Sequence, residues 1–228
     1  MQKTIDANQS QQTNQSQKVA VLGASGWIGS HLVNEAVSRG HEVIALVRDA
    51  EKFSTAGVQV RQFDLLDTQA DLATAVQGAD VVIAAVGGRA AGNHELVAQT
   101  AQRLLTTLPE TGVSRLLWVG GAGSLEVAPG VTLLSGPEFP DAYRAEAQAQ
   151  GEALAVFRQS DSPIAWTFVS PAAEIFPGEQ QAPYRVGGEQ LLTDADGNSR
   201  ISVSDYAVAM VDELEAEQYP NQRIGVAY

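Results

Sequence analysis

A glycine-rich segment, GASGWIG at residues 23–29, follows an apolar run and opens a segment of helical periodicity. Its place between an expected strand and an expected helix makes it a stronger signal than its letters alone. Gly23 permits a tight turn off the strand, and Gly26 lets the backbone approach a pyrophosphate. Gly29 allows the helix to lie close to the sheet. The segment therefore predicts a nucleotide-binding turn.

The start of the expected helix adds to this prediction. The free amides of Trp27 and Ile28 would point at the phosphates, with the helix dipole behind them. The spacing is G-x-x-G-x-x-G, because Ala24 stands where G-x-G-x-x-G needs its second glycine. A turn that serves only strand-to-helix packing is the alternative.

Short apolar runs alternate with segments of helical period through most of the chain. Strands are expected at 18–22, 42–47, 58–63, 80–86, 115–119 and 164–169, and helices at 28–40, 68–77, 97–108 and 140–159. This alternation is typical of an α/β protein with a parallel sheet and helices on both faces. Right-handed crossovers then favour the doubly wound Rossmann fold.

The pattern changes after Ser170 to proline, glycine and polar residues. We expect a hairpin of 190–192 against 199–203 around Asp196-Gly197, because Asp-Gly is a strong hairpin-turn signal. A last helix at 204–217 and a strand at 223–227 would complete the chain. These segments, about 171–228, are expected to form a small substrate region within a single NAD(P)-binding Rossmann domain, 18–228.

The first 17 residues are dominated by Gln, Asn, Ser and Thr. They hold too little apolar surface to offset their ordering entropy, so we expect a disordered tail at 1–17. The tail has no apolar signal-peptide region, and no later stretch is long and apolar enough for a membrane span. The expectation is a cytoplasmic protein with no membrane partner.

Composition excludes several classes of function. The chain has no cysteine, which removes disulfides, thiolate metal sites and cysteine nucleophiles. A formal net charge of -13 argues against nucleic acid as a partner, since phosphate-backbone recognition needs a basic surface. His31, His41 and His94 show no metal-ligand spacing, so no metal site is expected.

The end of the second expected strand bears on the choice of dinucleotide. A residue about 20 positions beyond the turn normally faces the adenosine ribose, where an acid binds the 2′-hydroxyl of NAD. Arg48 stands there, and its planar fork suits a 2′-phosphate. Ser25 and Lys52 could add contacts. NADP(H) is thus the preferred cofactor, while Asp49 keeps NAD(H) possible.

Other strand ends supply further cofactor candidates. Asp64 could accept a hydrogen bond from the adenine amino group while the Leu65 amide donates to the ring; a loop or helix-capping acid is equally compatible with the sequence. The run Ala85, Val86 and Gly87 would let the ribose pass close above the sheet. Ser170 and Pro171, which leave the sixth expected strand, would meet the nicotinamide carboxamide.

The motifs together resemble a known superfamily. GASGWIG, ALVRDAEK, FDLLD, AAVG, WVGGAGSLEVAPG and WTFVSPAA are similar to those of atypical short-chain dehydrogenases/reductases. The similarity extends over about 18–228 and is greatest to bacterial NAD(P)H-binding proteins known as NADH-flavin reductases, relatives of NmrA-like sensors and of biliverdin reductase B. The resemblance implies a Rossmann domain, NADP(H) binding and a small C-terminal substrate region.

The resemblance also implies two catalytic candidates. The wider superfamily uses a serine after the fifth strand, matched by Ser124, and a Tyr-x-x-x-Lys pair on the next helix, matched in part by Tyr143. Ala147 occupies the lysine position, and no lysine follows Lys52 anywhere in the chain. Without that ammonium a tyrosine is a poor base at neutral pH. Either side chain could instead only shape the pocket.

This departure guides the choice of function. Alcohol oxidation needs a proton acceptor, whereas hydride transfer from NADPH to a flavin, quinone or similar planar acceptor mostly needs orientation. We therefore expect an oxidoreductase with a small-molecule acceptor such as a flavin. A non-catalytic NADP(H)-binding redox sensor of NmrA-like type is the alternative. An epimerase or dehydratase is less compatible, because few residues follow the sixth strand. The oligomeric state is left open.

Overall fold

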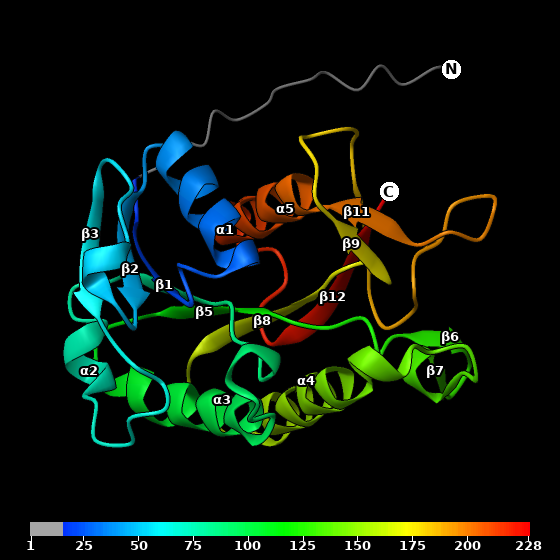
Figure 1. Ribbon diagram of the computed structural model, residues 1–228, viewed down its shortest axis with the longest axis horizontal. Coiled ribbons are helices and arrows are strands. Elements are labelled where there is room, and N and C mark those ends of the chain that lie inside the picture. Colours follow the sequence, from blue (N-terminus) through cyan, green and yellow to red (C-terminus); the bar gives the residue numbers. More distant parts are fainter. Residues whose placement is uncertain (1–15) are drawn as a thin grey trace, which may run out of the picture.

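The computed structural model describes residues 16–228 and has a Rossmann-like α/β fold built on an eight-stranded sheet (Figure 1). The sheet order is β10-β12-β8-β5-β4-β1-β2-β3. Its strands are β1 (Lys18–Leu22), β2 (Glu42–Val47), β3 (Val58–Gln62), β4 (Val81–Ala84), β5 (Arg115–Val119), β8 (Ala165–Ser170), β10 (Arg185–Gly187) and β12 (Gln222–Ala227). Every pair is parallel except β10 with β12. The sheet thus has the doubly wound form expected from the sequence.

Helices cover both faces of this sheet. They are α1 (Trp27–Ser38), α2 (Leu72–Ala75), α3 (Glu95–Thr107), α4 (Asp141–Gln159) and α5 (Val203–Ala216). Helices α1 and α5 lie on one face, and α2, α3 and α4 on the other (Figure 1). Short 3-10 helices span Ala50–Lys52, Arg89–Ala91, Leu108–Glu110 and Leu133–Ser135. The sheet therefore separates two apolar layers.

Successive side chains of a strand point to opposite faces of the sheet, so each strand contributes to both apolar layers. Val19 and Val21 of β1 join the core under α1 and α5, whereas Ala20 and Leu22 join the core under α3 and α4. Full burial of a valine or leucine side chain contributes roughly 1.5–3 kcal/mol, which is why a strand buried on both faces is almost wholly apolar. The long apolar runs in the sequence follow from this arrangement.

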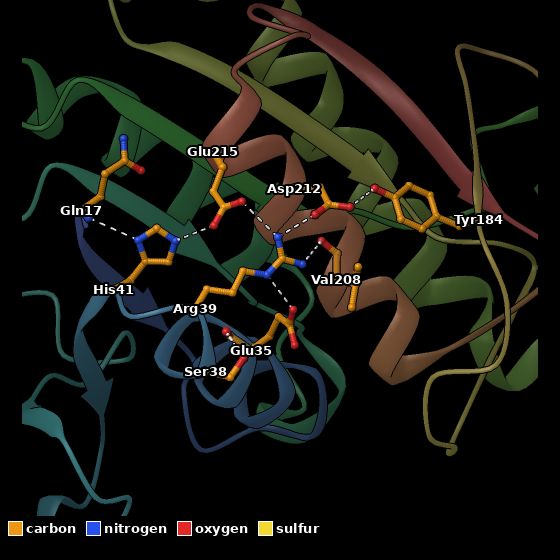
Figure 2. Close-up of polar contacts among 9 residues, drawn as sticks. All are labelled: Gln17, Glu35, Ser38, Arg39, His41, Tyr184, Val208, Asp212 and Glu215. Carbon is orange, nitrogen blue, oxygen red and sulfur yellow. Dashed lines mark hydrogen bonds and ion pairs between the residues drawn. The ribbon is translucent and has the colours of Figure 1, made fainter. Parts of the chain in front are cut away.

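A polar cluster joins α1 to α5 at the edge of one layer (Figure 2). The Arg39 guanidinium contacts Glu35, Asp212 and Glu215 at 2.6–3.1 Å. His41 Nε2 lies 3.1 Å from Glu215, and its Nδ1 accepts a hydrogen bond from the Gln17 amide. Three carboxylates around one guanidinium thus hold the exit of α1 against α5.

The C-terminal region differs from the expected hairpin. The expected turn is present, and Gly197 has a left-handed φ of 84°. However, β11 (Arg200–Ser202) pairs in parallel with β9 (Glu174–Phe176), so the prediction of a hairpin with 190–192 was wrong. The Asp196-Gly197 signal correctly predicted a turn, but the partner of β11 is β9, a strand further away in the sequence.

Two further differences concern local structure. The expected helix at 68–77 is one short helix, α2, whose N-terminal cap is the Asp71 side chain. The loop after β5 contains a small hairpin of β6 (Glu126–Ala128) and β7 (Val131–Thr132) that was not expected. The tail expected at 1–17 lies outside the described residues apart from its last two.

Candidate functional site

A cavity of about 910 Å³ lies over the carboxyl ends of the parallel strands. Residues at the ends of β1, β2, β4, β5 and β8 line it. In the sheet, β1 lies between β4 and β2, so the strand order changes direction at β1. Ligands of open α/β sheets bind at such a switch point. The volume lies within the roughly 300–1,000 Å³ of small-molecule sites. This cavity is the candidate binding site.

The glycine-rich turn forms one wall of the cavity. Gly23 has a φ of 80°, and a Cβ placed on it would lie 2.3 Å from the Ala85 oxygen. A Cβ on Gly29 would lie 2.1 Å from the Gly23 oxygen, whereas one on Gly26 would lie 3.1 Å from the same atom. Gly23 and Gly29 are therefore required by backbone packing, so packing accounts for two of the three glycines.

The beginning of α1 fits a phosphate group. Among residues 16–228, no hydrogen-bond acceptor is found for the backbone amides of Trp27 and Ile28, as expected for the first residues of a helix. No acidic residue lies in this first turn. The turn residues Gly23, Ser25, Gly26, Trp27, Ile28 and Gly29 all line the cavity. These residues fit the pyrophosphate of a dinucleotide.

Arg48 and Lys52 differ in their placement. Arg48 lines the cavity and is exposed, with no hydrogen bond or ion pair to another described residue. Lys52 does not reach the cavity, because its ammonium lies 2.7 Å from the Asp49 carboxylate. Their hydrogen bond lowers the pKa of Asp49 and raises the pKa of Lys52. Of Arg48, Asp49 and Lys52, only Arg48 lines the cavity.

Residues that follow β3 and β4 form a further part of the cavity wall. Asp64, Leu65, Ala85, Val86 and Gly87 all line the cavity. The Asp64 Oδ1 accepts a hydrogen bond from the Leu66 amide at 3.0 Å, while its Oδ2 has no partner among the described residues. Asp64 therefore acts as a loop acid that lines the cavity and keeps one carboxylate oxygen without a partner among the described residues.

The two catalytic candidates are separated in the structure. Tyr143 lines the cavity, and its side chain is exposed to 53%. Ser124 does not line it, because its hydroxyl accepts a hydrogen bond from Arg223 Nη1 at 3.2 Å. Ala147, at the lysine position, lines the cavity and packs against Gly123. A Cβ added to Gly123 would lie 2.7 Å from the Ala147 Cβ. The structure thus brings Tyr143, but not Ser124, to the site.

The residues after β8 are divided in the same way. Pro171 lines the cavity together with Ala172 and Ala173. Ser170 is buried and does not reach the cavity, and its hydroxyl has no hydrogen-bond partner within residues 16–228. Its backbone belongs to β8, which pairs with β12 at this point. Ser170 is therefore part of the core, and Pro171 begins the site.

Comparisons with known proteins agree with this geometry. A family model described as NAD(P)H-binding matches residues 23–214. The chain belongs to this NAD(P)H-binding family. The uncharacterised protein YwnB of Bacillus subtilis is 40% identical over 212 residues, which are 92% of this chain and 97% of that protein.

Two solved structures have the same fold over most of the chain. One, named a "putative NADH-flavin reductase", is from Streptococcus pneumoniae; it is 35% identical, with a TM-score of 0.84 over 93% of this chain and 99% of that one. The other, named a "putative exported protein", is from Burkholderia pseudomallei; it is 42% identical, with a TM-score of 0.83 over 93% and 100%.

Two residues that line the cavity, Glu146 and Gln150, were missed by sequence reasoning. The Glu146 carboxylate accepts hydrogen bonds from the amides of Gly88 and Arg89 at 2.9–3.2 Å. Gln150 donates to the Val86 carbonyl at 2.9 Å and accepts from Trp118 Nε1 at the same distance. The only sequence signal was that Glu146 and Gln150 share a helix face with Tyr143. Together they fasten α4 to the loop that follows β4.

The remaining acidic side chain of the cavity forms an ion pair. Besides Glu146 and Asp64, Glu174 is the only acidic residue among those described that lines the cavity, and its carboxylate lies 2.7 Å from Arg200.

No cluster of three or more His, Cys, Asp or Glu with metal-binding geometry occurs in residues 16–228. Within the same part of the chain, none of the helices combines the length and the apolar character that crossing a membrane requires.

Proposed function

We propose that the protein is an NADPH-dependent reductase that delivers hydride to a planar acceptor such as a flavin or a quinone. One observation carries this proposal: the glycine-rich turn, Arg48 and Tyr143 all line the same cavity. No lysine of the described residues lines it. When bound, reduced nicotinamide supplies a hydride, so the acceptor gains two electrons and, with a proton from water, is reduced while NADPH becomes NADP⁺.

The preference for NADPH rests on Arg48. A cationic fork without a carboxylate partner suits a dianionic 2′-phosphate, while the nearest acid, Asp49, is held by Lys52. An aspartate free to accept from a ribose 2′-hydroxyl would favour NADH instead. The ion pair therefore supports NADP(H) as the preferred cofactor.

The apolar residues of the cavity support the reaction class. We call the part of the cavity that would hold the acceptor the acceptor end, and assign to it Tyr143 and the apolar residues Leu133, Phe139, Pro140, Ala172 and Ile175. Apolar walls exclude water and hold a flat ring against the nicotinamide, and this orientation supplies much of the catalysis of hydride transfer. The Tyr143 hydroxyl can donate a hydrogen bond to the acceptor. The name of the Streptococcus pneumoniae structure, a "putative NADH-flavin reductase", is consistent with such an acceptor.

A panel of acceptors tests this function. NADPH oxidation is measured with FMN, riboflavin, quinones and enones, each against a reaction without protein. Turnover with at least one flavin or quinone is expected. Tight NADPH binding without turnover of any acceptor would contradict the proposal and favour a redox sensor.

A further inference from the structure

The cationic side chains of residues 16–228 divide into two groups. Most form an ion pair with a carboxylate; these are Lys18, Arg39, Lys52, Arg115, Arg144, Arg158, Arg200 and Arg223. The others are Arg48, Arg61, Arg89, Arg103 and Arg185. Of these, Arg61, Arg103 and Arg185 donate to backbone carbonyls outside the cavity. Only Arg48 and Arg89 line the cavity without a carboxylate partner.

Arg89 lies against the helix that carries the acceptor-side residues. Its guanidinium carbon lies 4.3 Å from the centre of the Tyr143 ring, and its Nη2 donates to the Ala142 carbonyl at 3.0 Å. Its backbone amide donates to Glu146 at 2.9 Å. Stacking on an aromatic ring fixes the plane of a guanidinium and leaves edge N–H groups for an anion. Arg89 is thus held in place while its side chain remains exposed.

No carboxylate of the described residues forms an ion pair with the Arg89 guanidinium. Glu146 accepts two backbone N–H groups of the loop after β4, and Glu174 is paired with Arg200. A protein with a net charge of -13 otherwise repels anionic ligands. Two arginines of the cavity without a carboxylate partner, Arg48 after β2 and Arg89 against α4, therefore indicate two separate anionic groups, of which Arg48 accounts for the first.

We propose that the acceptor carries an anionic group, a phosphate or a carboxylate, on its planar ring system, and that Arg89 binds this group. This inference rests on the proposed function and names the class of its acceptor. The ring lies between the apolar residues of the acceptor end, and its charged substituent reaches the cavity rim at Arg89. Arg89 is then the residue that distinguishes charged acceptors from neutral ones with the same ring.

FMN and riboflavin provide the test, because they share one ring system and differ in a phosphate. Dissociation constants of both are measured by flavin fluorescence on protein saturated with NADP⁺, for the wild type, Arg89→Ala and Arg89→Gln. Arg158→Ala is the matched control, since it removes an arginine whose side chain does not line the cavity. Thermal unfolding of each variant checks that it is folded.

The wild type is expected to bind FMN at least about 10-fold more tightly than riboflavin. Arg89→Ala and Arg89→Gln should weaken FMN about 10- to 100-fold, as expected for loss of a charge-assisted hydrogen bond. Riboflavin and NADP⁺ should bind these variants as they bind the wild type, and Arg158→Ala should bind all three ligands normally.

Three results of the flavin titrations would overturn the inference. They are equal FMN and riboflavin affinity in the wild type, no FMN binding at millimolar concentration, and an equal loss of both flavins in the Arg89 variants. Weaker NADP⁺ binding in those variants would also overturn it by assigning Arg89 to the cofactor. Because binding is measured without turnover, these results are independent of the acceptor panel, whose failure would instead contradict the reductase function.

Discussion

The Asp49 carboxylate lies 2.7 Å from the Lys52 ammonium, one turn further along the chain. This ion pair keeps both side chains out of the cavity and leaves Arg48 as the cation that lines it after β2. The sequence predicted three charged residues near the adenosine ribose, and of these only Arg48 lines the cavity.

Arg48→Ala is expected to weaken NADPH binding about 10- to 100-fold, because a hydrogen bond to a charged group contributes about 1.5–3 kcal/mol. NADH affinity should stay unchanged, since NADH has no 2′-phosphate. Isothermal titration of both nucleotides measures the effect. Arg158→Ala removes an arginine that does not line the cavity; it is the control and should alter neither constant appreciably. Equal NADPH and NADH affinity in the wild type would refute the preference.

Gly29→Ala is expected to destabilise the fold by about 1–3 kcal/mol, because its Cβ would lie 2.1 Å from the Gly23 oxygen. Gly26→Ala should cost less stability, since its Cβ would lie 3.1 Å from the same atom. It should instead lower NADPH affinity by blocking the pyrophosphate. Denaturant unfolding and NADPH titration separate the two effects. A Gly29→Ala protein as stable as the wild type would contradict the packing role.

Glu189 provides a prediction of pH dependence. Burial raises its pKa, but hydrogen bonds from Arg223 and Arg158 outweigh burial and hold the pKa below its ordinary value of 4.5. A lowered pKa in the folded state means that the stabilisation is present above about pH 4.5 and is lost as the pH falls further. Glu189→Gln should therefore lower the free energy of unfolding at about pH 6, and less so near pH 3.5.

The expected size of this effect is about 1 kcal/mol, because the Glu189 side chain is 50% exposed and screened by solvent. Urea unfolding at the two pH values measures it. Glu42→Gln is the control, since its ion pair with Lys18 is largely exposed. A difference between wild type and Glu189→Gln that does not change with pH would contradict the account.

The elements that the sequence predicted well are those fixed by local patterns. Strand β1, the glycine-rich turn and α1 follow from an apolar run, glycine chemistry and helical period within about 20 residues. Arg48 could be placed from the same local spacing. These features depend little on the rest of the chain.

The features that were missed depend on partners distant in sequence. Ser124 is 99 residues from Arg223, and Glu146 is 58 residues from Gly88. The pairing of β11 with β9 likewise needs a segment 26 residues away, although the turn at Gly197 is local. Which partner a hydroxyl or carboxylate takes is decided by tertiary packing, so a single sequence could name these residues but not their roles.

Tyr143→Phe tests how much the reaction needs a proton donor. A positioned general acid contributes about 10²- to 10⁴-fold, whereas orientation alone leaves the reaction largely intact. We expect the turnover number to fall by less than about 10-fold, because phenylalanine keeps the ring under Arg89. Steady-state kinetics across the pH range measures this. A loss of 100-fold or more would make Tyr143 a catalytic acid.

The central claim is that this cavity transfers hydride from NADPH to a planar acceptor. The most direct measurement is an anaerobic single turnover in which the protein is mixed with NADPH and FMN, and nicotinamide and flavin absorbance are followed together. The account predicts that both signals decay at one rate, and that deuterium at the transferred position of NADPH slows them equally. Nicotinamide and flavin signals that change no faster than in the reaction without protein would contradict it.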